Sequence, residues 1–113
     1  MDPTETIAPP TQDLQVRTRR NGEILWIELC GEIDLSNHRN LTQSLSSVDL
    51  DEGATLGLDL TKLTFCDARG LCHLLDMAEQ ATMKGRDVVA RHATATFRRM
   101  THILGYEVLV RFE

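Results

Sequence analysis

LDLTKLTFCDARGLCHLLDMAEQATMKG, residues 58–85, changes its hydrophobic period partway along. Its start continues an alternation of leucines at every second position, which predicts a half-buried strand over Leu56–Leu60. After Gly70 the apolar residues recur at the spacing of one helical face, at Leu71, Leu74, Leu75, Ala78 and Ala81. The segment therefore predicts a strand, a tight turn over Phe65–Gly70 and a helix that ends near Gly85, where a left-handed C-cap suits glycine.

The start of this helix is the candidate functional region. Asp67 is placed to cap the helix by accepting hydrogen bonds from its first free backbone N–H groups. Such a helix start offers unpaired donors and partial positive charge, which suit an anion or a partner's carboxylate. We therefore expect function to centre on residues Cys66–His73.

The N-terminal part of the chain predicts a tail followed by a hairpin. Residues 1–12 are acidic, contain all three prolines and are expected to form a disordered tail. Alternating residues predict strands over Leu14–Arg19 and Ile24–Cys30, and Asn21-Gly22 between them is a strong signal for a two-residue turn. One domain over residues 13–113 is expected.

Two further helices and two further strands complete the predicted domain. Ser36 is a candidate N-cap for a helix with inward residues Leu41, Leu45 and Val48. Short strands are predicted over Asp87–Arg91 and Val108–Phe112. The helix between them would be capped by Thr94 or Thr96, would end at Gly105 and would turn inward Phe97, Met100 and Leu104.

The order of these elements, β-β-α-β-α-β-α-β, indicates the α/β class. Strands that alternate with single helices pair in parallel through right-handed crossovers, whereas the first two strands form an antiparallel hairpin. The predicted architecture is a mixed sheet with its helices mainly on one face.

Composition excludes several classes of function. The chain has 113 residues and a net charge of −5, and its aromatic content of 4% leaves little for base stacking, so we expect no nucleic-acid partner. No apolar run approaches the roughly 20 residues that span a bilayer, and the acidic start does not resemble a signal peptide. We expect a cytoplasmic protein with no direct membrane insertion and with reduced thiols.

Three motifs resemble those of STAS domains, specifically the free-standing bacterial anti-sigma-factor antagonists. They are Gly31-Glu32-Ile33-Asp34-Leu35 before the first helix, Leu58-Asp59-Leu60 followed by Phe65-Cys66-Asp67-Ala68-Arg69-Gly70-Leu71, and the turn at Gly85. The resemblance covers roughly residues 14–112. It implies the STAS fold and a protein that binds a serine-kinase-type anti-sigma factor and thereby frees a sigma factor.

The sequence departs from the family at one position. In that family the turn reads Asp-Ser-Ser/Thr-Gly, and the hydroxyl residue before the glycine is phosphorylated by the anti-sigma kinase. Here Arg69 occupies that position and Ala68 precedes it, so the usual switch cannot operate there. Arg69 near the positive end of a helix is slightly unfavourable, which suggests either an acidic group on the partner or a solvated side chain over the turn.

The resemblance implies a partner surface formed by two segments. The expected contact residues are Asp34, Leu35, Ser36, Asn37, Asp67, Ala68, Arg69, Gly70, Leu71 and His73. A local cap or loop role is the alternative for Asp34, and N-cap and turn roles explain the hydroxyls of Ser36 and Thr64.

Cys66, Cys72 and His73 allow other chemistry at the same place. A nucleophile and base on adjacent helical residues would point about 100° apart, which argues against catalysis, and a zinc site needs a second ligand cluster that the sequence lacks. A redox role for Cys66 and Cys72 is possible because a helix start lowers a thiol's pKa, although small buried hydrophobes are the commoner role.

No glycine-rich phosphate cradle occurs, so we expect no cofactor, no metal and no enzymatic activity of the chain itself. The predicted function is that of an anti-sigma-factor antagonist not switchable by phosphorylation at the standard turn. One alternative is a STAS accessory subunit of an ABC-type lipid transporter, since such domains likewise have turns that cannot be phosphorylated. Another is an orphan STAS interaction module.

Overall fold

The computed structural model describes residues 4–6, 14–49 and 55–113, which form a six-stranded sheet and its helices. The strands are β1 (Thr4–Thr6), β2 (Leu14–Asn21), β3 (Ile24–Ile33), β4 (Thr55–Cys66), β5 (Asp87–Arg91) and β6 (Arg111–Phe112). The helices are the short 3₁₀ helix η1 (Leu35–Asn37), α1 (His38–Ser46), α2 (Ala68–Met83) and α3 (Ala95–Ile103).

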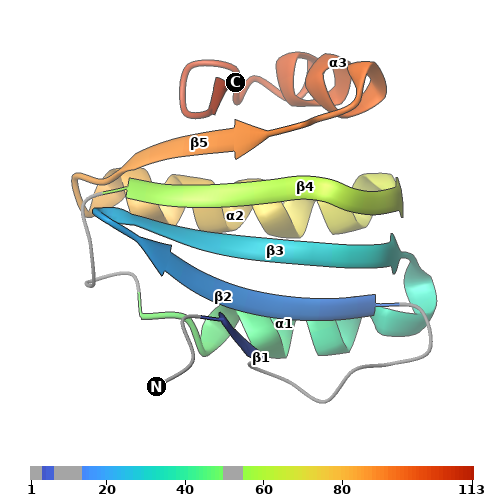
Figure 1. The fold of residues 1–113 in the computed structure, drawn as a ribbon. Helices are drawn as coiled ribbons and strands as arrows, with labels where there is room; N and C mark the ends of the chain where they lie inside the picture. The colour runs from blue at the N-terminus through green and yellow to red at the C-terminus, as the bar shows by residue number, and fades with distance from the viewer. Residues whose placement is uncertain (1–3, 7–13, 50–54) are drawn as a thin grey trace.

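The strands lie in the order β1-β2-β3-β4-β5-β6 across the sheet. Pairing is antiparallel from β1 to β3 and parallel from β3 to β6. Figure 1 shows α1 and α2 together behind the sheet, with α3 beyond the edge at β5. The α/β class and the mixed sheet are therefore confirmed, and the parallel strands end at the same side of the molecule as the start of α2.

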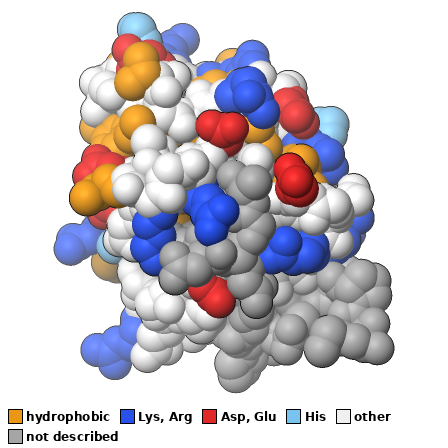
Figure 2. Space-filling view, turned by 90° about the vertical axis from the view of Figure 1, so that its left-hand side faces the viewer, with side chains coloured by type: hydrophobic (Ala, Val, Ile, Leu, Met, Phe, Trp, Pro, Cys, Tyr) orange, Lys and Arg blue, Asp and Glu red, His pale blue; other side chains and the backbone are white. Residues whose placement is uncertain are grey.

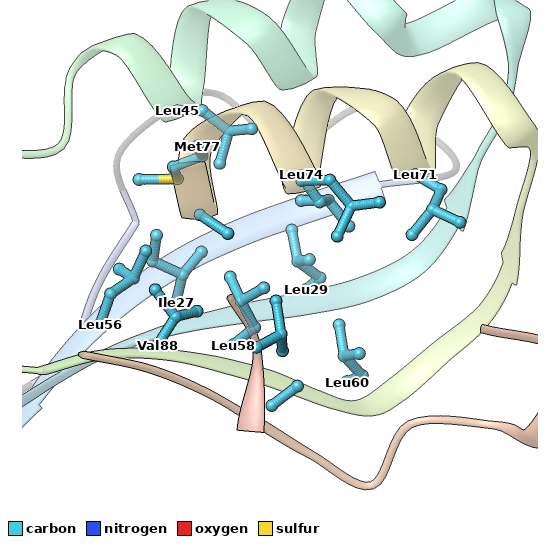
Figure 3. Packing of buried hydrophobic residues seen from close by; sticks show 14 of the residues in the cluster. Ile27, Leu29, Leu45, Leu56, Leu58, Leu60, Leu71, Leu74, Met77 and Val88 are labelled. Atoms are coloured by element: carbon cyan, nitrogen blue, oxygen red, sulfur yellow. The ribbon is translucent and has the colours of Figure 1, made fainter. Parts of the chain in front are cut away.

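The core lies between α2 and the sheet, where the two hydrophobic periods meet. The predicted apolar face of α2 is buried at Leu71, Leu74, Leu75, Ala78 and Ala81. It packs on inward strand residues such as Ile27, Leu29, Leu58 and Leu60, and Figure 3 shows these side chains directed toward one another. Full burial of one such side chain contributes about 1.5–3 kcal/mol, so this helix is held firmly in place.

The prediction of a disordered N-terminal tail is wrong at three residues. Thr4–Thr6 form β1, which pairs antiparallel with Arg17–Arg19 at the edge of the sheet, whereas the sequence predicts a disordered tail over residues 1–12. The rest of that tail lies outside the described residues. An edge strand needs neither an apolar face nor length, because backbone hydrogen bonds to β2 are enough, so no pattern in the sequence marks it.

The C-terminal helix and strand differ from their predictions. Thr94 caps α3 by accepting a hydrogen bond from the Phe97 N–H at 3.1 Å, as one of two predicted caps. Leu104 is 38% exposed rather than inward, and β6 comprises only Arg111–Phe112. Val108, expected in that strand, is 85% exposed because residues around it form turns.

Candidate functional site

The start of α2 carries the cap that the sequence predicts. The Asp67 carboxylate accepts a hydrogen bond from the Gly70 N–H at 2.7 Å, and its backbone oxygen accepts from the Leu71 N–H at 3.0 Å. The Asp67 N–H donates to the Ile33 carbonyl at 3.0 Å, which ties the helix start to the end of β3. Because β4 runs on to Cys66, the turn is shorter than predicted and only Asp67 separates strand from helix.

A second capped turn, η1, follows β3. Asp34 is its N-cap: the Asp34 carboxylate accepts from the Ser36 N–H at 2.9 Å, and the Asp34 N–H donates to Asn37 Oδ1 at 3.0 Å. The predicted cap of the following helix at Ser36 is wrong, because α1 begins at His38 and Asn37 occupies its N-cap position. The Asn37 amide also donates to the Glu32 carbonyl at 2.8 Å. This reciprocal capping box fixes the turn and leaves Leu35 at its tip with 81% of its surface exposed.

His38 connects the two turns, and sequence reasoning missed it. Its Nε2 lies 2.9 Å and 3.0 Å from the two carboxylate oxygens of Asp67, and since an ionised carboxylate only accepts, Nε2 is the donor. The His38 side chain is only 12% exposed, and its ring meets the His73 ring edge-on at 5.5 Å between centroids. The two residues of the pair are 29 positions apart, so no local pattern in the sequence could have shown it.

These contacts set the charge state of Asp67. Desolvation by burial tends to raise the pKa of Asp67, but the hydrogen bonds from Gly70 and His38 and the nearby charges of His38 and His73 together lower it. Asp67 therefore stays ionised around neutral pH. Its carboxylate accepts hydrogen bonds from Gly70 and His38 of the same chain, so it positions the turn.

The fold is expected to depend on this ionised group. Because the pKa of Asp67 is lower in the folded than in the unfolded chain, its contribution is present at neutral pH and is lost as the pH falls from about 4 through the folded value. Asp67→Ala should lower the free energy of unfolding by about 1–2 kcal/mol at neutral pH. The loss should shrink in acid, where the wild-type carboxyl is protonated. Urea unfolding at neutral pH and at acid pH measures both differences.

Asp76→Ala is the matched control for that measurement, because Asp76 is exposed on the same helix. It should cost little at either pH. A loss for Asp67→Ala that is the same in acid as at neutral pH would contradict the role of its ionised form.

The predicted contact residues fall into three groups by exposure. Leu35, Ser36, Ala68 and Arg69 are exposed and lie on the two turns that the His38–Asp67 pair joins. Three others have buried side chains or none to present, so they shape the turns rather than meet a partner: Asn37, Gly70 and Leu71. The half-buried ones are Asp34, Asp67 and His73.

The two candidate redox thiols differ from each other. Cys66 is half-buried, and desolvation raises its pKa to about 12, with Asp67 and then Cys72 adding to the shift. Such a thiol is a poor nucleophile at neutral pH. Cys72 is exposed, so the prediction of a buried hydrophobe is wrong for it. All three cysteines of the chain are free thiols in this structure.

Within the described ranges, no three His, Cys, Asp or Glu side chains come together as metal ligands. Over the same part of the chain, none of the helices combines the length and the apolar character needed to cross a bilayer.

Comparison with solved structures supports the fold. An anti-sigma factor antagonist from Mycobacterium paratuberculosis is similar, with a TM-score of 0.69 and 24% identity over 92% of this chain and 89% of that one. SpoIIAA in its phosphorylated form, a Bacillus cell fate determinant, has a TM-score of 0.67 and 16% identity over 87% of this chain and 90% of that one. At these identities the likeness shows the fold alone.

Three further comparisons concern a longer protein, the curated proteins and a family model. Part of the murine anion transporter Slc26a9 is similar at a TM-score of 0.60 and 18% identity, over 90% of this chain but 18% of that one. No curated protein matches the chain. The family model described as "Mlab, STAS domain" matches residues 16–111, and the chain therefore belongs to the STAS-domain family.

Proposed function

We propose that this protein is an anti-sigma-factor antagonist: a regulatory binding protein, not an enzyme, that docks on a serine-kinase-type anti-sigma factor and releases a sigma factor. Two findings support the proposal. The chain belongs to the STAS family, and its structure is similar to an anti-sigma factor antagonist and to SpoIIAA. A partner of this kind acts on transcription, so the proposal places the protein in the cytoplasm of a bacterium.

The docking surface in this proposal consists of the tips of η1 and of the β4–α2 turn. Leu35 and Ser36 on the first tip, and Ala68 and Arg69 on the second, are exposed. The capping box in η1, the Asp67 cap and the His38–Asp67 pair hold both tips in place before a partner arrives. Such pre-organisation lowers the entropy that binding must overcome.

One observation supports the proposal that the usual phosphorylation switch is missing: residue 69 is arginine and residue 68 is alanine. Neither has a hydroxyl that could accept phosphate. The nearest hydroxyls on the two segments are engaged, since Ser36 Oγ donates to Asp34 at 2.5 Å and Thr64 Oγ1 donates to the Gly31 carbonyl at 3.0 Å. A phosphate would have added about −1.5 to −2 charges at this surface, whereas Arg69 gives it a permanent positive charge.

The same observation favours a second candidate function, the accessory subunit of an ABC-type lipid transporter. In that role the two tips would pack on an ATPase subunit, and a residue that cannot be phosphorylated would be expected at the turn.

Titration calorimetry distinguishes the two candidates. The purified protein is titrated with serine-kinase-type anti-sigma factors and, separately, with transporter ATPase subunits from the same organism. The proposal predicts a complex with an anti-sigma factor at micromolar affinity or better, and release of its bound sigma factor. Binding to an ATPase subunit and to none of the anti-sigma factors would replace the first proposal with the second.

A further inference from the structure

One edge of β4 is open beyond the end of β5. β5 pairs with β4 only over residues 55–59, whereas β3 pairs with β4 as far as Cys66. Among the described residues, no strand lies beside residues 60–66 on the side away from β3. Figure 1 shows β4 running on past the arrowhead of β5. A strand edge of this kind presents backbone N–H and C=O groups that have no partner in the sheet.

A groove of about 580 Å³ opens along this edge, and its lining includes every residue from 63 to 66. Successive side chains of a strand point to opposite faces, so a groove on one face of β4 would touch every second residue. Contact with consecutive residues means that the groove meets β4 from its edge. The N-cap and the first turns of α3 form another wall, through Thr94, Thr96, Phe97 and Met100.

The first part of the open edge is protected, and the last part is free. The Thr61 N–H donates to Asp59 Oδ1 at 3.1 Å, and the exposed Lys62 follows it. Side-chain partners and lysines of this kind protect a strand edge against pairing. Residues 63–66 include no lysine or proline. A shift in register near Thr64 is held from the other side, where the Thr64 hydroxyl donates to the Gly31 carbonyl of β3 at 3.0 Å.

We infer that this edge accepts an extended segment of a partner protein, which adds to the sheet as a strand beside residues 63–66. The backbone of the segment pairs with the open edge of β4. The side chains on one of its faces enter the groove against Phe65, which is 53% exposed, and against Met100. Strand addition takes its affinity from main-chain hydrogen bonds and its specificity from alternate side chains. The partner segment therefore has no proline at the paired positions and is apolar at every second position.

The charges near the groove agree with an apolar face on the segment. Asp67 is the one charged residue among the lining residues that the structure describes, and its carboxylate already accepts hydrogen bonds from Gly70 and His38. The opposite end of the molecule differs, because basic and acidic side chains both lie at its surface (Figure 2). Uncharged side chains are therefore the ones that this groove accepts.

The position of α3 favours a single segment over a second copy of this domain. A second copy would bring its own β4 edge together with its own α3 into a groove that already has α3 as a wall. An extended segment has no such flanking helix. The inference goes beyond the proposed function, because it requires neither an anti-sigma factor nor a transporter subunit.

The test uses a labelled peptide of about seven residues, which spans roughly 23 Å when extended. Valine at every second position and threonine between give it one apolar and one polar face, and a terminal lysine keeps it soluble. Fluorescence anisotropy should show binding with a dissociation constant of about 100 μM or lower. Amide hydrogen exchange of the protein should slow within residues 63–66 when the peptide is bound.

Two N-methylated versions of the peptide test whether its backbone pairs with β4. An N-methyl group removes the N–H donor and leaves the side chain in place. One version carries methyl groups on the valines, and the other carries them on the threonines. The N–H groups of alternate residues point to opposite sides of a strand, so only one of the two sets faces β4. One version should bind as the parent peptide does, and the other about tenfold or more weakly.

A pair of variants tests the position of the bound peptide. Phe65→Ser should weaken binding about tenfold, because it removes the exposed aromatic side chain from the groove. Met83→Ser makes the same kind of change at a residue that is 79% exposed at the far end of α2, and it should leave the affinity unchanged.

Four results would overturn the inference. These are no binding of the peptide, equal affinity of the two N-methylated versions, equal effects of Phe65→Ser and Met83→Ser, or self-association in sedimentation equilibrium that Phe65→Ser abolishes. The last result would assign the edge to a second copy of the chain. None of these measurements uses an anti-sigma factor, so they leave the proposed function to its own test.

Discussion

Gly70→Val is expected to lower the free energy of unfolding by about 2–4 kcal/mol and to remove partner binding with it. A Cβ at this position would collide with the Ile33 Cγ2 methyl group and lie 2.9 Å from Asp67 Oδ1. Ile33 is fully buried and cannot move aside cheaply. Overpacking costs about 1–3 kcal/mol, and loss of the Asp67 cap adds about 1 kcal/mol. Thermal unfolding should shift down by on the order of 10 °C.

Cys72→Val is the matched control, because it introduces the same β-branched side chain two residues later in α2 at an exposed position. It should change stability by only a few tenths of a kcal/mol. If Gly70→Val were as stable as Cys72→Val, the close approach between β3 and the start of α2 would not exist in solution. The β4–α2 turn, which carries Arg69, would then lie elsewhere.

Arg69→Glu is expected to weaken the proposed complex with an anti-sigma factor about tenfold or more, while the fold stays intact. Arg69 is exposed at the second tip, in the first turn of α2. A change of two charge units there replaces attraction to an acidic partner by repulsion, and like charges placed together at an interface cost up to several kcal/mol. Titration calorimetry at low and at moderate salt should show the largest difference at low salt.

Arg111→Glu makes the same charge change at an exposed position on β6. It should leave the affinity nearly unchanged. Equal weakening by the two variants would mean that only net charge matters, and unchanged affinity of Arg69→Glu would mean that Arg69 is a solvated side chain.

The helical period and the caps of α2 could be predicted from the sequence because they are local. Asp67 caps α2 as expected, and Gly85 adopts φ +78° at its end, where the Arg86 N–H donates to the Ala81 carbonyl at 2.9 Å. The parallel order of the later strands follows from alternation of strands and helices, which is a rule of connection rather than of any one residue.

The rest depends on contacts between distant segments. β4 extends to Cys66 because Glu32 and Ile33 pair with Phe65 and Cys66, past a shift in register that no alternation of residues records. The His38–Asp67 pair likewise requires that η1 lie beside α2. The groove between β4, α2 and α3 has no sequence signature, since its lining comes from three separate elements.

A phosphate-transfer assay tests directly whether the β4–α2 turn, which carries Arg69, binds its partner without a phosphorylation switch. The wild-type protein and Arg69→Ser are incubated with the anti-sigma kinase that binds the protein and with radiolabelled ATP, and the labelled peptides are mapped. We expect no label on residues 64–73 of the wild-type protein, and its complex should persist in the presence of ATP. We expect label on residue 69 of the variant, and its complex should weaken. Phosphate recovered on residues 64–73 of the wild-type protein would contradict this expectation.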